Sequence, residues 1–596
     1  PYWAWENDKF ETIQKRIVAN ANLGYDFTDW LSLDYTVGVN EYMFSRKSIV
    51  NLGSRGYAGK GYLSKTESSN QAIESTLLLT FKERFQDFGV RATLGHNFNQ
   101  DTYEAMGASG KDIINPKIFD LANTKGQTAS ESYSRTRKWG LFADILLDYK
   151  EWAFLNISGR NDVSSTLPIE NNSFFYPALS GSVVFTDALG LDSSIFNFGK
   201  VRAGWAKVGN DAGPYYYNGT FIVGSPYMGQ GMMELPTVLY DPELEPEFTT
   251  EFEAGVDFKF FESRIGLDFT YYNRISENQI GAKTSAPSTG YSSFVTNFGS
   301  ISNKGFELGL DLYPIVTKDF TWSMYLVYTK NKSEITELAD GVDEIVIGGD
   351  FSAPQAVLIK GQPYGVLKGE KLARTKDGIP LVDPSTGMYI NDKEMGIIGD
   401  PNPEFKTALT NTLKYKDLAL SFMFDYQKGG CVYSSYLTDL LGRGVTKDTE
   451  NRLGTRVIKG VYGDANTLEP ILDADDNYIW NTTVIAEADL WFSDGTYSTF
   501  AINSCDEVAT YDATVWRLRE VTLAYNLPKK FANKLRLSNA EISVVGRNLW
   551  YFAPNVPKYT NYDPVVNTFG NTNVQGIDYT GAPSTRRFAF NLSLTF

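Results

Sequence analysis

The chain has 596 residues, a formal net charge of −16, only two cysteines and a single histidine. Its acidity, without any cluster of lysine or arginine, argues against binding to nucleic acid. The low cysteine and histidine counts argue against a disulfide framework, a thiolate zinc site and a Ser-His-Asp triad. No apolar run approaches the roughly 18 residues of a membrane-spanning helix, but membrane β-strands alternate in polarity and escape that test.

Period-two alternation runs through the chain and predicts β-strands with one apolar and one polar face. The clearest examples, in chain order, are 88–98, 251–260, 305–312, 320–328, 418–424 and 588–596. In the last of these, Phe590 and Leu592 alternate with Asn591 and Ser593. Counting all such segments gives about seventeen strands. The predicted fold class is therefore all-β.

Short and long connections alternate between these strands. Short turns are expected near 26–30, 85–88, 148–151, 260–263, 314–319 and 414–417, and two somewhat longer ones near 187–198 and 526–537. Long loops are expected near 107–131, 210–246, 338–403, 431–512 and 552–582. A membrane β-barrel has this pattern, with short turns on the periplasmic side and long loops outside.

A row of soluble β-sandwich domains would also be rich in strands. Sandwiches, however, give no reason for long loops to fall on every second connection. In addition, four tryptophans lie near strand ends, where the aromatic girdles of membrane barrels place them: Trp30, Trp152, Trp322 and Trp550. The sequence therefore favours a large antiparallel transmembrane β-barrel, with the apolar face of 588–596 in contact with outer-membrane lipid.

Several stretches resemble the SusC/RagA family of TonB-dependent outer-membrane transporters of Bacteroidetes-type bacteria. They are NPEFKTALTNTLKYKDLALSFMFDYQKGG (402–430), WRLREVTLAYNLP (516–528), SVVGRNLWYFAP (543–554), PYWAWENDKF (1–10) and GQPYGVLKGEKL (361–372). The resemblance implies a barrel of the 22-strand class, filled by a plug, in the outer membrane of a Gram-negative bacterium. It also implies two partners: a SusD-like surface lipoprotein that covers the barrel, and the TonB–ExbB–ExbD complex that supplies energy.

The chain departs from the family pattern at its start, where no plug and no TonB-contact segment precede the first strand. We expect those parts upstream, with residues 1–596 forming the carboxy-terminal part of the barrel. About seventeen strands then require roughly five more in a barrel of this class. Because the turn at 26–30 would be periplasmic, the strand at 11–26 runs inward and needs a strand before it. We therefore expect that residues 1–596 alone cannot close a barrel.

These features predict import of oligosaccharides as the barrel of a SusCD-like transporter, with no bond made or broken. Import of peptides by the same mechanism is the alternative. A passive porin is a rival of another class, which the long loops 338–403 and 431–512 disfavour. An outer-membrane enzyme or adhesin is a further rival. However, no H-E-x-x-H, Walker A or G-x-S-x-G motif occurs, and His96 falls on an apolar strand face that favours a structural role.

Candidate substrate contacts come from one polar strand end and three aromatic loop regions. Aromatic rings stack on sugars or on peptide side chains, and Asn and Asp hydrogen-bond hydroxyls or amides. Packing of the loops, or of the partner lipoprotein, explains the aromatics equally well. The candidates are Arg160, Asn161 and Asp162 in GRNDVSS (159–165), Asn210, Asp211, Tyr215 and Tyr217 in 209–221, Trp480 and Trp491 in 477–497, and Tyr551 in 548–564.

Two weaker features concern a metal ion and a disulfide. Asp473, Asp475 and Asn477 could supply oxygen ligands to Ca²⁺, but Tyr478 stands where an EF-hand loop needs Gly, which favours a solvated acidic loop. No other cofactor is expected. Cys431 and Cys505 bracket one long loop, so a disulfide between them and two free thiols are both compatible with the sequence.

Overall fold

The structure is a computed structural model that describes residues 2–191, 193–339, 341–349, 354–492, 500, 505–534 and 536–595. The chain divides into two compact units. The first consists of Pro1–Val183, Gly204–Thr250 and Glu277–Phe298, and the second of Val184–Ala203, Glu251–Ser276 and Gly299–Phe596.

Long antiparallel strands make up most of both units. They are β1 (Lys9–Thr28), β2 (Leu31–Val50), β3 (Tyr62–Phe85), β4 (Phe88–Ile113), β5 (Thr124–Tyr149), β6 (Ala153–Ser164), β7 (Ser173–Val184), β8 (Phe196–Asn210), β12 (Glu247–Phe260), β13 (Ile265–Thr284), β14 (Ser293–Val316), β15 (Phe320–Leu338), β21 (Pro403–Tyr415), β22 (Leu418–Gly429), β28 (Val515–Asn526), β29 (Asn539–Phe552) and β31 (Arg587–Thr595). Within the described ranges, these strands and the short strand β11 (Val238–Tyr240) are the 18 strands of the main sheet. The all-β prediction is confirmed.

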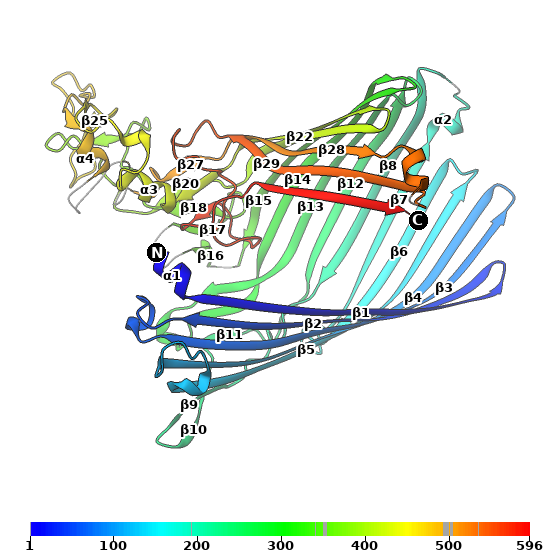
Figure 1. The fold of residues 1–596 in the computed structure, drawn as a ribbon, viewed down its shortest axis with the longest axis horizontal. Coiled ribbons are helices and arrows are strands. Elements are labelled where there is room, and N and C mark those ends of the chain that lie inside the picture. Colours follow the sequence, from blue (N-terminus) through cyan, green and yellow to red (C-terminus); the bar gives the residue numbers. More distant parts are fainter. Residues whose placement is uncertain are drawn as a thin grey trace. The chain divides into compact units, whose positions relative to one another are not determined.

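In the first unit, neighbouring strands β1 to β7 pair in chain order, and β1 to β5 lie side by side as a set of long hairpins (Figure 1). The pairing of β3 with β4 runs without interruption from Phe85 opposite Phe88 to Tyr62 opposite Lys111. Gln86 in the tight turn has a φ of 55°, the left-handed conformation that two-residue hairpins use.

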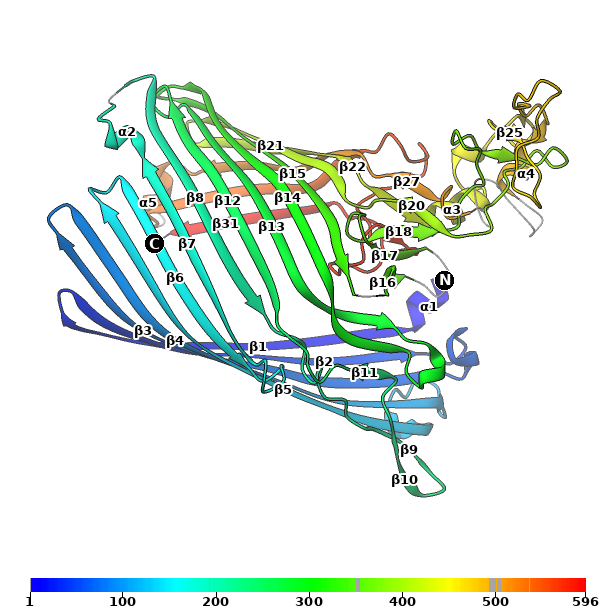
Figure 2. The same ribbon diagram turned by 180° about the vertical axis from the view of Figure 1, so that it is seen from behind.

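In the second unit, β15, β21, β22, β28, β29 and β31 pair antiparallel in that order. Figure 2 shows β15, β21 and β22 side by side. In β31, Leu592 lies opposite Ile542, and Asn591 lies opposite Ser543. The register therefore keeps apolar residues on one face and polar residues on the other.

The apolar rows of the long strands are exposed rather than buried. Leu94, on β4, is 55% exposed and Phe590, on β31, is 67% exposed. A soluble sheet would cover such rows with another layer, whereas the strands of a membrane barrel present them to lipid. Aromatic residues gather where the hairpins turn: Trp30 contacts Phe81, and Tyr149 contacts both Phe88 and Trp152. This is the arrangement of an interfacial girdle.

The segment 107–131 differs from the expectation of a long loop. β4 continues to Ile113 and β5 begins at Thr124, with Gly107 opposite Ser130, so that only 114–123 connects them. The small and polar residues of 107–113 and 124–131 do not alternate with apolar ones, so the sequence pattern did not indicate strands here. Alternation is required only where one face of a strand meets an apolar medium.

Buried cores lie in the connections of the second unit. Leu358, Leu367, Leu381, Leu437 and Leu490 all have 0% exposure, and all belong to the segments 338–403 or 431–512. Two further buried clusters join these segments: Leu381 packs with Val461, and Val382 packs with Ile485. The long connections are therefore folded structures with their own apolar cores.

The remaining elements are short. The helices are α1 (Tyr2–Asn7), α2 (Phe185–Ala188), α3 (Ser435–Gly442), α4 (Glu487–Trp491), α5 (Lys529–Lys534), η1 (Gly56–Gly59), η2 (Leu121–Asn123), η3 (Pro287–Thr289) and η4 (Lys447–Thr449). The short strands are β9 (Ile222–Tyr227), β10 (Gln230–Glu234), β16 (Glu344–Gly349), β17 (Gln355–Ile359), β18 (Val366–Gly369), β19 (Leu381–Val382), β20 (Gly396–Gly399), β23 (Cys431–Ser434), β24 (Thr455–Arg456), β25 (Val461–Tyr462), β26 (Ile485–Ala486), β27 (Thr510–Asp512) and β30 (Ile577–Asp578). Among the described residues, no helix has the length and apolar character needed to cross a membrane.

Candidate functional site

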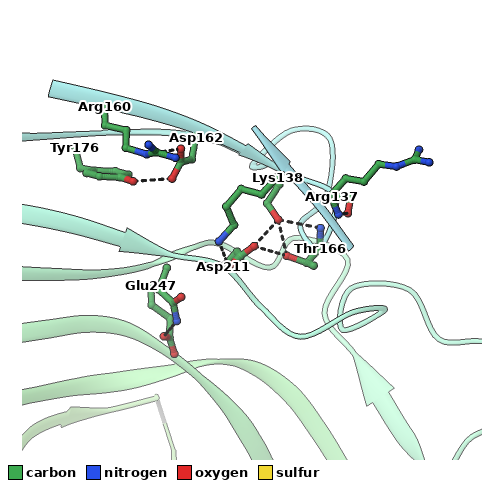
Figure 3. A network of polar contacts seen from close by, with 11 residues as sticks. Arg137, Lys138, Arg160, Asp162, Thr166, Tyr176, Asp211 and Glu247 are labelled. Carbon is green, nitrogen blue, oxygen red and sulfur yellow. Dashed lines mark hydrogen bonds and ion pairs between the residues drawn. The ribbon is translucent and has the colours of Figure 1, made fainter. Parts of the chain in front are cut away.

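A polar network in the first unit brings several candidate residues together, beginning with Arg160, Asp162 and Tyr176 (Figure 3). Arg160 on β6 lies opposite Tyr176 on β7 in the strand register. Arg160 Nε donates to Asp162 Oδ1 over 2.7 Å, and the Tyr176 hydroxyl donates to Asp162 Oδ2 over 2.6 Å. The Asp162 side chain is only 7% exposed, and Arg160 and the Tyr176 hydroxyl compensate its buried charge. The Arg160 guanidinium also stacks over the Phe142 ring at 5.4 Å.

Asn161 does not join this group. Successive residues of a strand point to opposite faces, so Asn161 lies on the other side of β6 from Arg160 and Asp162. Its Nδ2 donates to Ser173 Oγ over 3.1 Å. The structure therefore separates Asn161 from the two residues with which the sequence grouped it.

Asp211, directly after β8, is the second centre of the network. Lys138 Nζ lies 2.7 Å from Asp211 Oδ1, while Ser164 and Thr166 donate to Asp211 Oδ2 over 2.5 and 3.2 Å (Figure 3). Burial alone would raise the pKa of Asp211, but the hydrogen bonds from Lys138 and Ser164 outweigh it and hold the pKa below its ordinary value of 3.8. Asp211 therefore stays ionised and ties the segment after β8 to β5 and to the end of β6.

Asn210 and Glu247 close the base of the same connection. Asn210 Nδ2 donates to Glu247 Oε2 over 2.9 Å, and the backbone N–H of Ile280 donates to Glu247 Oε1 over 2.7 Å. These contacts join the last residue of β8 to the first residue of β12. The segment 211–246 is therefore held at both ends.

The two tyrosines predicted in this segment have different environments. Tyr217 packs against a buried cluster that contains Leu167, Phe174 and Leu244. Tyr215 is 46% exposed and has a φ of 65°. Packing thus accounts for Tyr217, whereas Tyr215 remains accessible for a contact.

Trp480, Trp491 and Tyr551 belong to the second unit. Trp491 packs against Phe500, with ring centroids 5.4 Å apart, and against a buried cluster around Leu490. Trp480 is 59% exposed. The neighbouring aromatic stretch 493–497 lies outside the described residues. Only Trp480 of these two tryptophans presents most of its ring to solvent.

Tyr551 lines a cavity of about 210 Å³, which we call the tyrosine cavity. Its walls are Tyr436, Asn548, Tyr551, Asn561, Tyr562, Asp563, Val566, Gly581, Pro583, Ser584 and Arg586. They come from α3, from the end of β29 and from the segment that joins β29 to β31. Among the sequence candidates, Tyr551 is the residue that lines this cavity.

The acidic turn around Asp473 is organised by its own backbone. Asp473 Oδ1 accepts hydrogen bonds from the N–H groups of Asp475 and Asn477, both at 2.9 Å. The Asn477 N–H bond, chiefly, lowers the pKa of Asp473. Asp383 accepts from the N–H of Ser385 in the same way, in a hairpin without an acidic cluster. The described residues contain no group of three or more His, Cys, Asp or Glu side chains arranged to hold a metal.

Burial and packing account for the two cysteines and the histidine. Cys431 and Cys505 are both free thiols, so the disulfide that the sequence left open is not formed in this structure. Burial raises the pKa of Cys431 to about 12 and that of Cys505 to about 11. His96 stacks on Trp139 of the neighbouring strand, with ring centroids 6.3 Å apart.

Lys138, Tyr176 and Glu247 were not anticipated as members of the network. A signal for Lys138 exists in the strand register. Tyr149 pairs with Ala153 across the tight turn, and counting outward along both strands places Lys138 opposite Ser164 and Phe142 opposite Arg160. The contacts to Asp211 and Glu247 depend on strands distant in sequence and have no such local signal.

Three comparisons relate the chain to known proteins. Residues 1–363 match the family described as TonB dependent receptor-like, beta-barrel. The chain is 24% identical, over 97% of its length, to TonB-dependent receptor P3 of Formosa agariphila, and 23% identical, over 74% of its length, to TonB-dependent receptor SusC of Bacteroides thetaiotaomicron. The chain spans 58% and 40% of these two relatives, respectively.

The fold is also similar to a solved structure, that of the RagAB peptide transporter. The TM-score is 0.78 at 17% identity, and the match covers 100% of this chain and 63% of that chain. At this identity the likeness establishes the fold.

Proposed function

Because the chain belongs to the TonB-dependent receptor-like β-barrel family, whose members lie in the outer membrane of Gram-negative bacteria, we propose that it is the barrel portion of an oligosaccharide importer. Import would be translocation without chemistry on the cargo. A SusD-like surface lipoprotein would cover the barrel, and TonB–ExbB–ExbD would supply energy through parts of the protein outside this chain. Both partners are inferred from the resemblance to SusC.

The observation that carries the choice of cargo is the charge balance of the polar network. Arg160 pairs with Asp162, and Lys138 pairs with Asp211, so these four charges cancel within the protein. The carboxylate of Glu247 is occupied by hydrogen bonds from Asn210 and from the backbone of Ile280. What remains for a ligand is a surface of hydroxyls, amides and the Arg160 face, which suits a neutral, hydroxyl-rich molecule. We assign this face of β6 to the lumen, since the opposite face carries Ile157 and Leu155.

Import of peptides remains the second candidate. It is favoured by the fold likeness to the RagAB peptide transporter. The two cargoes share a mechanism, so a direct uptake measurement separates them.

The test uses the full-length protein in its own host. Cells that lack the gene are complemented with wild type, with Arg160→Ala, or with Asn161→Ala, and uptake of a labelled oligosaccharide mixture and of a labelled peptide mixture is measured. We expect wild type to restore oligosaccharide uptake and Arg160→Ala to reduce it, whereas Asn161→Ala, on the opposite face of β6, matches wild type. Restoration of peptide uptake alone would replace this proposal with the second candidate.

A further inference from the structure

The tyrosine cavity has a fixed aromatic wall. The rings of Tyr436 and Tyr562 are stacked, with centroids 6.2 Å apart and planes 27° apart. The Tyr562 hydroxyl donates to Asp578 Oδ2 over 2.9 Å, and Asp578 is itself only 1% exposed. Tyr551 donates its hydroxyl to the backbone carbonyl of Asn561. The anchored hydroxyls of Tyr562 and Tyr551 keep these two rings from turning freely. Tyr562 is only 4% exposed and forms the back of the wall, so the half-buried rings of Tyr436 and Tyr551 are the ones that offer surface to a flat apolar ligand face.

Asp563 on the cavity wall has a buried side chain, and only one of its two carboxylate oxygens accepts hydrogen bonds from the described residues. Asp563 Oδ1 accepts from Arg517 Nη2 over 3.0 Å and from the backbone N–H of Val565 over 3.3 Å. The side chains of Asp563 and Arg517 are 9% and 5% exposed. Asp563 Oδ2 has no hydrogen-bond partner within the part of the chain that the structure describes. A carboxylate oxygen of an ion-paired Asp can accept a hydrogen bond from a neutral hydroxyl.

A β-bulge shapes the neighbouring wall. The pairing of β28 with β29 shifts register between Leu518 and Glu520, and Asn548 at this point has a φ of 52°. Bulges redirect side chains and occur next to functional sites. Asn548 Nδ2 donates to the carbonyl of Thr585, so the bulge also holds the segment that leads to Arg586 on the cavity wall.

The size of the cavity limits what it can hold. Its volume of about 210 Å³ is below the roughly 300–1,000 Å³ of pockets for drug-sized molecules, so it fits a single substituted ring. Its polar lining of Asn548, Asn561 and Ser584 offers amide and hydroxyl groups rather than an excess of one charge. An extended peptide would need a groove or a strand edge rather than one small cavity.

We propose that the tyrosine cavity binds one sugar ring of the cargo, with an apolar ring face against the tyrosine wall and a hydroxyl donating to Asp563 Oδ2. This inference rests on the proposed function, because it assigns a subsite to an oligosaccharide importer. Selectivity then comes from which hydroxyl reaches Asp563 while the ring stays stacked. Epimers that differ at that hydroxyl bind differently.

The test measures saturation-transfer NMR on the purified full-length protein with glucose, galactose, mannose, xylose and rhamnose, and with the dipeptide Ala-Ala. We expect at least one monosaccharide to bind and Ala-Ala not to compete with it. Ser584→Phe should fill the cavity from an exposed position and weaken binding about tenfold or more, the loss expected for stacking plus a hydrogen bond. Asn571→Phe, also exposed and outside the cavity wall, is the control and should bind as wild type does.

Absence of monosaccharide binding, equal binding by Ser584→Phe and wild type, or competition by Ala-Ala would each overturn the subsite. The uptake assay keeps this result separate from the proposed function. If wild type imports oligosaccharides while Ser584→Phe binds and imports normally, the subsite is wrong and the importer stands. If wild type imports none, the proposed function fails whatever the cavity binds.

Discussion

Lys138 of β5 and Asp211, which follows the last residue of β8, form an ion pair with 2.7 Å between Nζ and Oδ1. They are 73 residues apart in sequence. Since Ser164 and Thr166 donate to the same carboxylate, a single side chain ties the connection 211–246 to two other strands.

Asp211→Asn should release this connection. Loss of charge-assisted hydrogen bonds to a largely buried carboxylate costs about 1–3 kcal/mol, and the effect should be local. Hydrogen–deuterium exchange would show faster exchange in 211–221 with little change in β1 to β4. Glu67→Gln is the control, because the Lys65–Glu67 pair is exposed on both sides and should contribute nothing measurable. Equal protection of 211–221 in wild type and Asp211→Asn would contradict the anchoring role.

The same anchor should depend on pH in the acid range. The folded-state pKa of Asp211 lies below its ordinary value of 3.8, so its stabilising contribution is present above that value. It is lost as the pH falls through the lowered folded-state pKa. The protection factors of 211–221, which correct exchange for its intrinsic pH dependence, should therefore be unchanged between pH 7 and 5 and should fall below about pH 4. In Asp211→Asn this acid-dependent step should be absent.

The buried pair of Arg517 and Asp563 should be sensitive to loss of one partner. Asp563→Ala leaves the Arg517 guanidinium, which is 5% exposed, with only the more distant carboxylate of Asp425 at 3.6 Å, which costs about 1–3 kcal/mol. Urea unfolding of the full-length protein in detergent measures this. Glu520→Ala breaks the exposed pair between Glu520, which like Arg517 is on β28, and Arg547 on β29. The two side chains are 39% and 62% exposed, and the loss should cost less than about 1 kcal/mol. Similar losses for both variants would contradict the assigned burial.

The faces of β31 can be tested by placing a charge on each. Leu592 pairs with Ile542 on the apolar face, and Asn591 pairs with Ser543 on the polar face. Leu592→Arg should cost about 2–4 kcal/mol if it lies at the bilayer midplane, whereas Asn591→Arg should be tolerated. Folding into lipid vesicles compares the two. Equal losses would refute the assignment of faces.

The two thiols should resist alkylation in the folded protein. With pKa values raised to about 12 and about 11, Cys431 and Cys505 carry almost no thiolate at pH 8. Mass spectrometry after iodoacetamide treatment should find both unmodified until denaturant is added. Rapid modification of the native protein, or recovery of a Cys431–Cys505 peptide, would contradict this.

The strands inside the membrane were predictable from sequence because lipid on one face imposes alternation, as in β31. The register was also accessible, since a tight turn such as Tyr149 to Ala153 fixes every pair along its hairpin. The extension of β4 to Ile113 could not be predicted from sequence, because the part of a strand that lies in water needs no apolar face. In the site, the strand register places Arg160 and Asp162 on one face of β6 and Asn161 on the other, since adjacent residues of a strand point to opposite faces. Their roles as substrate contacts stay a prediction.

The contacts between segments far apart in the chain could not be predicted from the sequence. Nothing near Asp211 indicates Lys138, and nothing near Tyr551 indicates Tyr436 or Asp563. These contacts depend on how connections fold over the strand ends, which many different packings of the same composition would allow.

The length of β4 and β5 has a mechanical consequence. Each has 26 residues, which at about 3.4 Å per residue extend roughly 85 Å, whereas crossing the bilayer takes only about 9–11 residues. One ladder of hydrogen bonds therefore passes through two solvents. In lipid, each opened pair would leave backbone N–H and C=O groups without hydrogen-bond partners, at a cost of several kcal/mol per group. In water, the freed groups form hydrogen bonds with the solvent. Unzipping of this hairpin should thus start at η2 and halt at the membrane surface, so that the bilayer itself limits how far the strands can separate.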